Sequence, residues 1–303
     1  MSDTERAIIS TLAFFDLFDH APTSYELYSV LTVSSFVPWS TFQAALFALE
    51  QGGCIKNDTA FWFFSGRNML IDTRRARQEW IARKMKRAIR AARLLRYVPF
   101  VDAVCACNRL AAGHPHEESD IDFFIIIRAG RLWFARFLVT ALLQAAGLRR
   151  HDTSISDRVC LSFYITSDAA SLQSVSLAGD DIYLRYWIVS LLPLWSDEGV
   201  MEKFWEENAW AREVLYASPM PIPFLRKRTV VFIWMVERLL RGRLGARLEM
   251  YARAWQKKRI EQKMASHAIP NAVVISDTML KFHENDRREW YRAAWEERKK
   301  QYA

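Results

Sequence analysis

The stretch at residues 105–127 constrains the fold of this chain more than any other. It reads CACNRLAAGHPHEESDIDFFIII, which predicts a short strand, a turn through Gly113 and Pro115, and a second strand that begins at Asp120. Residues 123–127 are five consecutive apolar residues, and such a run between turn signals indicates a buried strand. The sequence therefore predicts a strand-turn-strand unit at the centre of an α/β region.

Two carboxylates, Asp120 and Asp122, open the second strand. Side chains at i and i+2 of a strand share one face, so these two groups lie side by side. Neighbouring carboxylates raise each other's pKa unless a cation lies between them, and Mg²⁺ or Mn²⁺ is a natural partner for oxygen ligands. The alternative is a pair that only faces water. The apolar run behind the pair and the basic segment before it favour a metal site.

This segment resembles the signature of the nucleotidyltransferase (polymerase-β-like) superfamily, a Gly-Ser turn followed by Asp-hydrophobic-Asp-hydrophobic. Residues 119–123 match the acidic half, and residues 110–113 match the turn downstream of Gly-Ser. Asn108 and Arg109 stand where the family has Gly-Ser. The resemblance implies that Asp120 and Asp122 hold the metal and act in catalysis. It also implies a nucleotide-binding and phosphate-binding set of Asn108, Arg109, Gly113 and Ser119.

A third strand is predicted at residues 158–166, and in the resembling family this strand supplies a third catalytic carboxylate. Ser162 stands in the middle of it here. Asp157 is the nearest candidate, with Asp152 before it. In a regular strand Asp157 and Ser162 point to opposite faces, because they are an odd number of residues apart.

The activity that the resemblance implies is the metal-dependent transfer of NMP from a nucleoside triphosphate to an unidentified acceptor hydroxyl, with release of pyrophosphate. The missing Gly-Ser and third carboxylate leave an alternative open. In that alternative, a degenerate nucleotidyltransferase fold binds nucleotide or nucleic acid without catalysis.

Residues 1–66 predict a winged helix, with three helices and a hairpin around 57–60. Capping boxes at 23–26 and 40–43 are expected to open the second and third helices. The helix at 40–50 contains no Lys or Arg, and affinity for nucleic acid depends on phosphate contacts by cations. We therefore expect a docking module and no DNA binding by the winged helix.

Residues 67–97 predict one basic bridging helix. Its cations form either a solvated face or a ridge for RNA or another anionic acceptor. A nucleotidyltransferase-like core with a mixed sheet is expected at 98–176. A helical C-terminal domain is expected at 177–303, with helices near 180–192, 201–215, 224–240 and 244–264. In that domain, Lys281, His283, Arg287 and Arg288 either approach a triphosphate or are surface charges. The predicted fold class is α+β.

The bulk properties of the 303 residues fit this interpretation. A net charge of +8 and a pI of about 9.4 favour anionic partners. The apolar run at 229–236 is shorter than the about 20 residues that a span needs, so no membrane partner is expected. Four cysteines without CxxC pairing, and no signal pattern, predict a reducing cytoplasm. The arrangement resembles uncharacterised bacterial nucleotidyltransferase-like proteins, which brings no known substrate.

Overall fold

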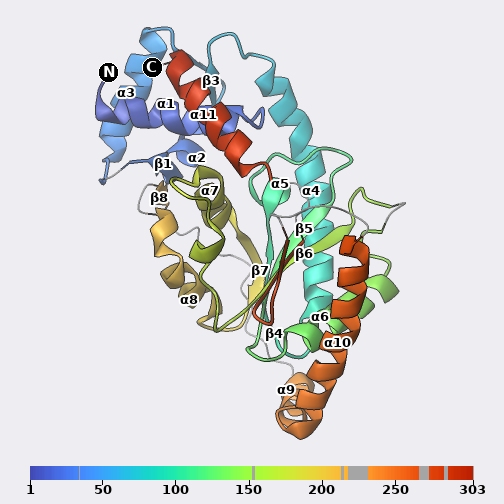
Figure 1. Ribbon diagram of the computed structural model, residues 1–303. Coiled ribbons are helices and arrows are strands. Elements are labelled where there is room, and N and C mark those ends of the chain that lie inside the picture. The colour runs from blue at the N-terminus through green and yellow to red at the C-terminus, as the bar shows by residue number, and fades with distance from the viewer. Residues whose placement is uncertain are drawn as a thin grey trace.

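A six-stranded mixed sheet lies at the centre of the protein (Figure 1). The computed structural model describes residues 1–33, 35–151, 154–212, 215–217, 231–265, 273–282 and 286–302. The strand order is β7-β4-β5-β6-β10-β9. The bounds are Val101–Ala106 for β4, Ile121–Ile127 for β5, Val159–Thr166 for β6, Leu192–Ser196 for β7, Val273–Ile275 for β9 and Met279–Phe282 for β10. The α+β class with a mixed sheet is confirmed.

β5 and β6 form the parallel pair of the sheet, and the other neighbouring strands are antiparallel. A parallel pair needs a crossover connection, which α6 (Leu132–Ala145) supplies. β7, β9 and β10 come from residues beyond 176, so the sheet takes half of its strands from the segment that was predicted to be helical. The division into a core at 98–176 and a C-terminal domain stays a prediction.

The apolar run of β5 is buried on both faces of the sheet. Phe123 and Ile125 pack in the cluster that includes residues of α4 (Leu70–Leu95) and α6. Phe124 and Ile126 pack on the opposite face, against α7 (Ile182–Ser190) and α8 (Val200–Glu207). α10 (Arg243–Ala265) adds side chains to the first cluster (Figure 1). Because successive strand residues alternate between faces, a strand covered on both sides reads as a continuous apolar run.

Three helices and a hairpin make up the first 64 residues. The helices are α1 (Asp3–Asp16), α2 (Ser24–Ser29) and α3 (Trp39–Gln51), with β1 (Val30–Thr32) after α2, and β2 (Ile55–Asp58) pairs with β3 (Phe61–Phe64). The capping box of Thr23 and Glu26 is confirmed. The box predicted at Ser40 is wrong, because the helix already begins after Pro38 and Ser40 lies inside its first turn.

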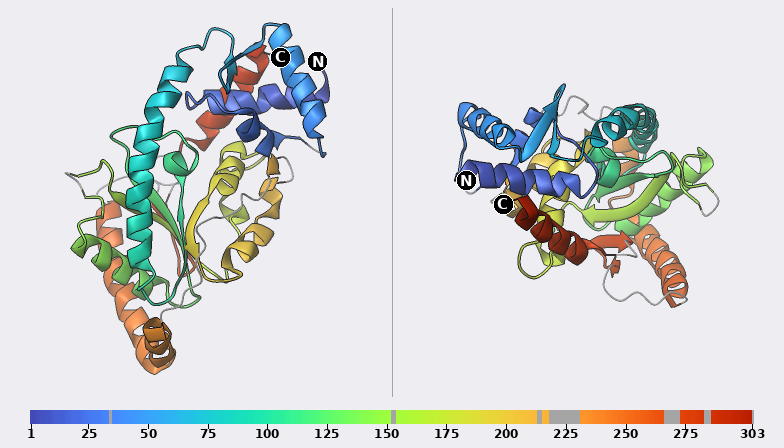
Figure 2. Two further views of the ribbon diagram at one scale, coloured as in Figure 1. Left: turned by 180° about the vertical axis from the view of Figure 1, so that it is seen from behind. Right: turned by 90° about the horizontal axis from the view of Figure 1, so that it is seen from above.

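This N-terminal unit shares its core with the C-terminal part of the chain. Ile182, Tyr186 and Trp295 join the apolar cluster of α1 and α3, and Tyr186 stacks on Phe14 with ring centroids 3.8 Å apart. α11 (Arg288–Tyr302) lies alongside α1, and both chain ends lie at this end of the molecule (Figure 2). β1 also pairs with β8 (Leu215–Ala217).

The basic helix expected at 67–97 is α4, and three of its cations are buried rather than solvated. Arg74 contacts Glu26 at 2.6 Å, and Arg77 donates to the carbonyl of Asp19 at 2.7 Å. Lys84 is fully buried. Arg74 and Arg77 tie the first part of α4 to the N-terminal unit, and Lys84 ties its middle to the segments that precede β5 and β6. The buried cations of α4 therefore hold the fold together. Only its exposed cations are available for the predicted anion-binding ridge.

The remaining described helices depart in part from the sequence prediction. The helix expected at 180–192 ends at Ser190, since Leu192 starts β7. α9 (Val231–Leu239) and α10 match the later part of the expected pattern, whereas residues 224–230 lie outside the described residues. Short 3-10 helices occupy Gln173–Val175 and Ala209–Arg212. In the described part of the chain, no helix is long and apolar enough to cross a membrane.

Candidate functional site

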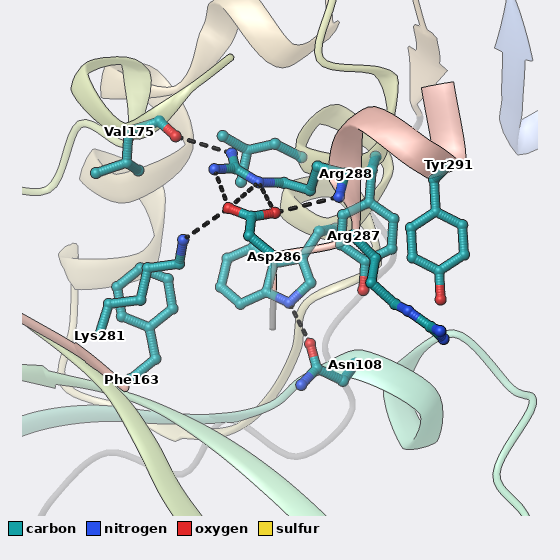
Figure 3. A pocket seen from close by; sticks show the side chains of 11 residues that line it. Asn108, Phe163, Val175, Lys281, Asp286, Arg287, Arg288 and Tyr291 are labelled. Atoms are coloured by element: carbon teal, nitrogen blue, oxygen red, sulfur yellow. Dashed lines mark hydrogen bonds and ion pairs between the residues drawn. The ribbon is translucent and has the colours of Figure 1, made fainter. Parts of the chain in front are cut away.

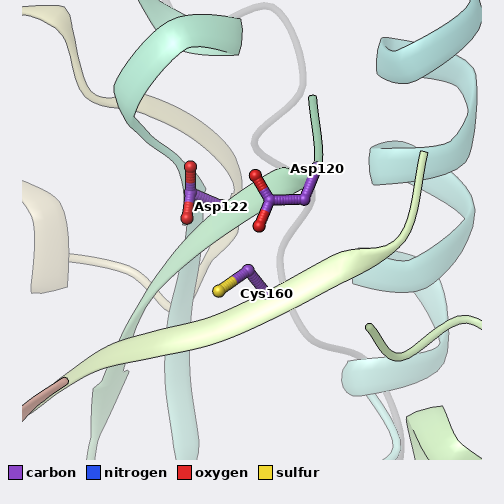
Figure 4. A group of neighbouring side chains, drawn as sticks. All are labelled: Asp120, Asp122 and Cys160. Carbon is purple, nitrogen blue, oxygen red and sulfur yellow. The ribbon is translucent and has the colours of Figure 1, made fainter. Parts of the chain in front are cut away.

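Asp120 and Asp122 lie together where β5 begins, and Cys160 joins them from β6 (Figure 4). Asp122 and Cys160 are register partners in the parallel pair. One ligand atom from each of the three side chains lies within 4.8 Å of the other two. The two carboxylates therefore lie close together, as predicted, and the thiol of Cys160 is the third member of the group.

Burial and the neighbouring charges control protonation in this group. Burial and then the charge of Asp120 raise the pKa of Asp122 from 3.8 to about 7, against the lowering effect of hydrogen bonds from Asn108 and Cys160. Burial, with the charges of Asp122 and Asp120, raises the pKa of Cys160 to about 12. At neutral pH the cysteine is therefore a neutral thiol, so any negative charge of the group is carried by the carboxylates.

An arginine already neutralises part of this charge. Arg150 donates from Nη1 to Oδ2 of Asp120 at 2.6 Å. Its backbone N–H donates to the carbonyl of Val159, so the arginine is held beside the start of β6. Two neighbouring carboxylates are stabilised by a cation beside them, and Arg150 supplies one. A metal ion bound at Asp120 would compete with Arg150 for this carboxylate.

Asn108 occupies a strained position at the start of α5 (Asn108–Ala111), the short helix that follows β4. Its φ of 53° lies in the left-handed region, which Asn tolerates better than most residues. Its Oδ1 accepts a hydrogen bond from the indole of Trp187 at 2.6 Å, and its side chain also bonds Asp122. The backbone N–H of Cys107 donates to the carbonyl of Asp122 at 3.0 Å. These contacts hold the turn after β4 against the acidic pair.

A cavity of about 160 Å³ lies on the other side of Asn108 (Figure 3). Arg288 is fixed in its wall by Asp286 and Asp181, each at 2.7 Å, and Lys281 lies 3.8 Å from Asp286. Arg287 also lines the cavity, is exposed, and makes no ion pair with any residue that the structure describes. His283, expected here, lies outside the described residues, and so does Asp152, the other carboxylate that the sequence suggested for the third strand.

A second cavity of about 310 Å³ adjoins the first and shares Asn108, Tyr183 and Tyr291 with it. Tyr183 and Tyr291 stack with ring centroids 5.0 Å apart. Aromatic residues of α1, α7 and α11 line the second cavity, and Arg109 adds an exposed cation. The two cavities place flat aromatic surfaces and guanidinium groups next to the acidic pair.

Asp157 does not join the acidic pair, contrary to the sequence prediction. Its carboxylate is buried against α4, 2.7 Å from Nζ of Lys84 and 2.9 Å from Nε of Arg83. Lys84 also donates to the carbonyls of Ser119 and Glu117, at 2.6 Å and 2.9 Å. Asp157 is thus a structural anchor, and its partners on α4 turn it away from Asp120.

Two other predicted residues have structural contacts. Gly113, with a φ of 75°, packs beneath Arg74, and a side chain there would approach the ring of His20 to 3.2 Å. The hydroxyl of Ser119 donates to the carbonyl of His116 at 2.9 Å, within the turn. Neither residue lines the two cavities described above.

Sequence reasoning missed Cys160 and Arg150. The sequence did contain a signal for Cys160. It lies two residues before Ser162 in the predicted third strand, so a regular strand places both side chains on the same face. Arg150 had no such signal, because its contact with Asp120 depends on how the chain returns from α6 to β6. No family model matches the chain, and no curated protein or solved structure matches it. Fold and site therefore define the class only as an α+β protein with a dicarboxylate-thiol cluster beside two cavities.

Proposed function

We propose that this protein is a nucleotidyltransferase of the polymerase-β-like kind, which binds a nucleoside triphosphate and Mg²⁺ or Mn²⁺ and transfers NMP to an acceptor hydroxyl. The observation that carries the proposal is the acidic pair Asp120 and Asp122, together with Asn108, whose side chain bonds Asp122 and which lines both cavities. The order of strand, turn, acidic strand, helix and parallel strand gives further support.

The donor set fits a divalent cation. Asp120 and Asp122 would hold it, because two adjacent carboxylates of which one is buried gain most from a positive neighbour. Without the cation, Cys160 is a neutral thiol beside them, since burial raises its pKa. Bound there, the cation would supply charge neutralisation for the phosphates and an activated acceptor oxygen.

The remaining residues bind and orient the substrates. Arg287 and Lys281 supply cationic groups for the phosphate oxygens on one side of Asn108, and Arg109 supplies another on the second side. Tyr183 and Tyr291 offer a ring surface on which a nucleobase can stack. The left-handed Asn108 replaces the glycine of the resembling turn and keeps the backbone close to Asp122.

Exposed cations on α4 favour an anionic acceptor such as RNA. Lys86, Arg90 and Arg93 are exposed at i, i+4 and i+7, which places them along one face of the helix. Phosphate contacts of this kind give affinity without sequence preference. We assign the N-terminal unit as a winged helix that docks on α7 and α11 and reads no DNA, since α3 has no Lys or Arg.

A second candidate function is nucleotide binding without turnover. Arg150 on Asp120, and a thiol where the family has its third carboxylate, favour it. Both features lower the negative charge available to a catalytic metal and leave the acceptor hydroxyl without a base.

One assay tests both candidates. The full chain is incubated with each α-labelled nucleoside triphosphate, with Mg²⁺ or Mn²⁺, and with or without RNA, beside Asp120→Ala/Asp122→Ala. Label transfer that the double variant loses supports the transferase. Binding without transfer supports the second candidate. Transfer that persists in the double variant excludes this site as the catalytic one.

A further inference from the structure

An exposed apolar surface lies at the far end of the molecule from the N-terminal unit, where α9 meets α10 (Figures 1 and 2). Five large apolar side chains of α9 are between 53% and 71% exposed. We call this surface the apolar corner, and it comprises Val231, Phe232, Trp234, Met235 and Leu239 of α9 together with Leu244 of α10. Isolated exposed apolar residues are ordinary, but a contiguous group of this size marks an interaction site.

The opposite side of α9 fixes which side chains face outward. Ile233, Glu237 and Leu240 are buried, at the i, i+4, i+7 spacing of one helix face. Glu237 accepts hydrogen bonds from the backbone N–H of Phe100 and from Arg128, both at 2.7 Å. A buried carboxylate with two partners holds the helix in one rotation about its axis. The packing of the opposite side of α9 therefore determines that the side chains of the apolar corner face outward.

The exposed charges of residues 231–248 have one sign. Within residues 231–248, Glu237 is the single carboxylate, and it is buried. Four arginines in the same segment are exposed: Arg238, Arg241, Arg243 and Arg247. Exposed aromatic and aliphatic side chains flanked by arginines are complementary to an anionic lipid surface, where the apolar groups enter the acyl boundary and the guanidinium groups contact phosphates.

We propose that the apolar corner docks on the surface of an anionic membrane. α9 would lie in the interface without crossing it, which a nine-residue helix is too short to do. The sequence prediction of no membrane partner depended only on the apolar run at 229–236 being too short to cross a bilayer. That reasoning does not exclude a helix that lies on the membrane surface. Because the corner is at the opposite end from the N-terminal unit, docking leaves α1 and α11 uncovered (Figure 1).

Flotation of the full chain with lipid vesicles tests the proposal. Vesicles of phosphatidylcholine with about 30% phosphatidylglycerol are compared with phosphatidylcholine alone, since the attraction requires anionic headgroups. The wild type is expected to float with the anionic vesicles and to be released at about 0.5 M salt, which screens surface charges within a few ångströms. Phe232→Ser/Trp234→Ser and Arg241→Glu/Arg243→Glu are each expected to lose most of the bound fraction.

Phe47→Ser is the matched control, because Phe47 is an equally exposed aromatic residue on α3, away from the corner. It should float as the wild type does. Equal binding to neutral vesicles, or no flotation of the wild type, would overturn the proposal. A dimer in light scattering that the Phe232→Ser/Trp234→Ser variant loses, without any flotation, would assign the corner to a second copy of the chain instead.

Discussion

Replacing Asp122 with Asn is expected to stabilise the metal-free protein at alkaline pH. The folded state raises the pKa of Asp122 from 3.8 to about 7, chiefly because the carboxyl is buried and Asp120 lies beside it. Between these two values the folded state keeps a proton that the unfolded state releases, so stability falls as pH rises through this window. Asparagine never ionises and escapes the penalty.

The size of the effect follows from the pKa difference. Each pKa unit corresponds to about 1.4 kcal/mol, which sets an upper bound of roughly 4 kcal/mol above pH 7. Because Asp122 is only partly buried and water screens part of the effect, we expect about 2 kcal/mol in the free energy of unfolding near pH 8. The two proteins should differ little near pH 4, where the native carboxyl is protonated.

Urea denaturation in a chelating buffer at several pH values measures this difference. Adding Mn²⁺ should then reverse the order, because a cation held by Asp120 and Asp122 stabilises the wild type by about 2.7 kcal/mol at a hundredfold excess over the dissociation constant. The Asn variant should gain much less. A variant no more stable than the wild type near pH 8, with no dependence on pH, would refute the assigned burial of this carboxylate.

Three further predictions concern neighbouring residues. Arg150→Gln should tighten Mn²⁺ binding in titration calorimetry, because the guanidinium competes for the acidic pair; an unchanged affinity would contradict that competition. Lys84→Met should lower the free energy of unfolding in urea by about 3 kcal/mol, because Asp157 loses its buried partner, whereas Arg87→Met should cost under about 1 kcal/mol. Cys160→Asp should strengthen Mg²⁺ binding and raise label transfer through a third carboxylate. Cys160→Ser is its control, and equal behaviour of the two variants would argue against this position as a ligand.

Local patterns in the sequence predicted the elements that local chemistry determines. The apolar run after Asp122 predicted a buried strand, and the i, i+2 spacing placed Asp120 and Asp122 together. The capping box at Thr23 and the length of α4 were also readable, because caps and helical periodicity depend on neighbours within a few residues.

Long-range pairing was not readable in the same way. β10 pairs with β6 although more than a hundred residues separate them, and its four residues carry no alternation that selects this partner. β7 follows the apolar helix α7 almost directly, and only its first residue, Leu192, fell within the predicted helix; the rest was not predicted as a strand. Asp157 illustrates the same limit at the site, since Lys84, which holds it, comes from a distant helix.

Anomalous diffraction from crystals grown with Mn²⁺ and a non-hydrolysable nucleoside triphosphate would test the central claim most directly. The account predicts a manganese peak bound by Asp120 and Asp122, with Arg150 displaced from Asp120 and the triphosphate beside Asn108 and Arg287. A nucleotide bound elsewhere, with Arg150 still paired to Asp120 and no manganese at the two carboxylates, would contradict it.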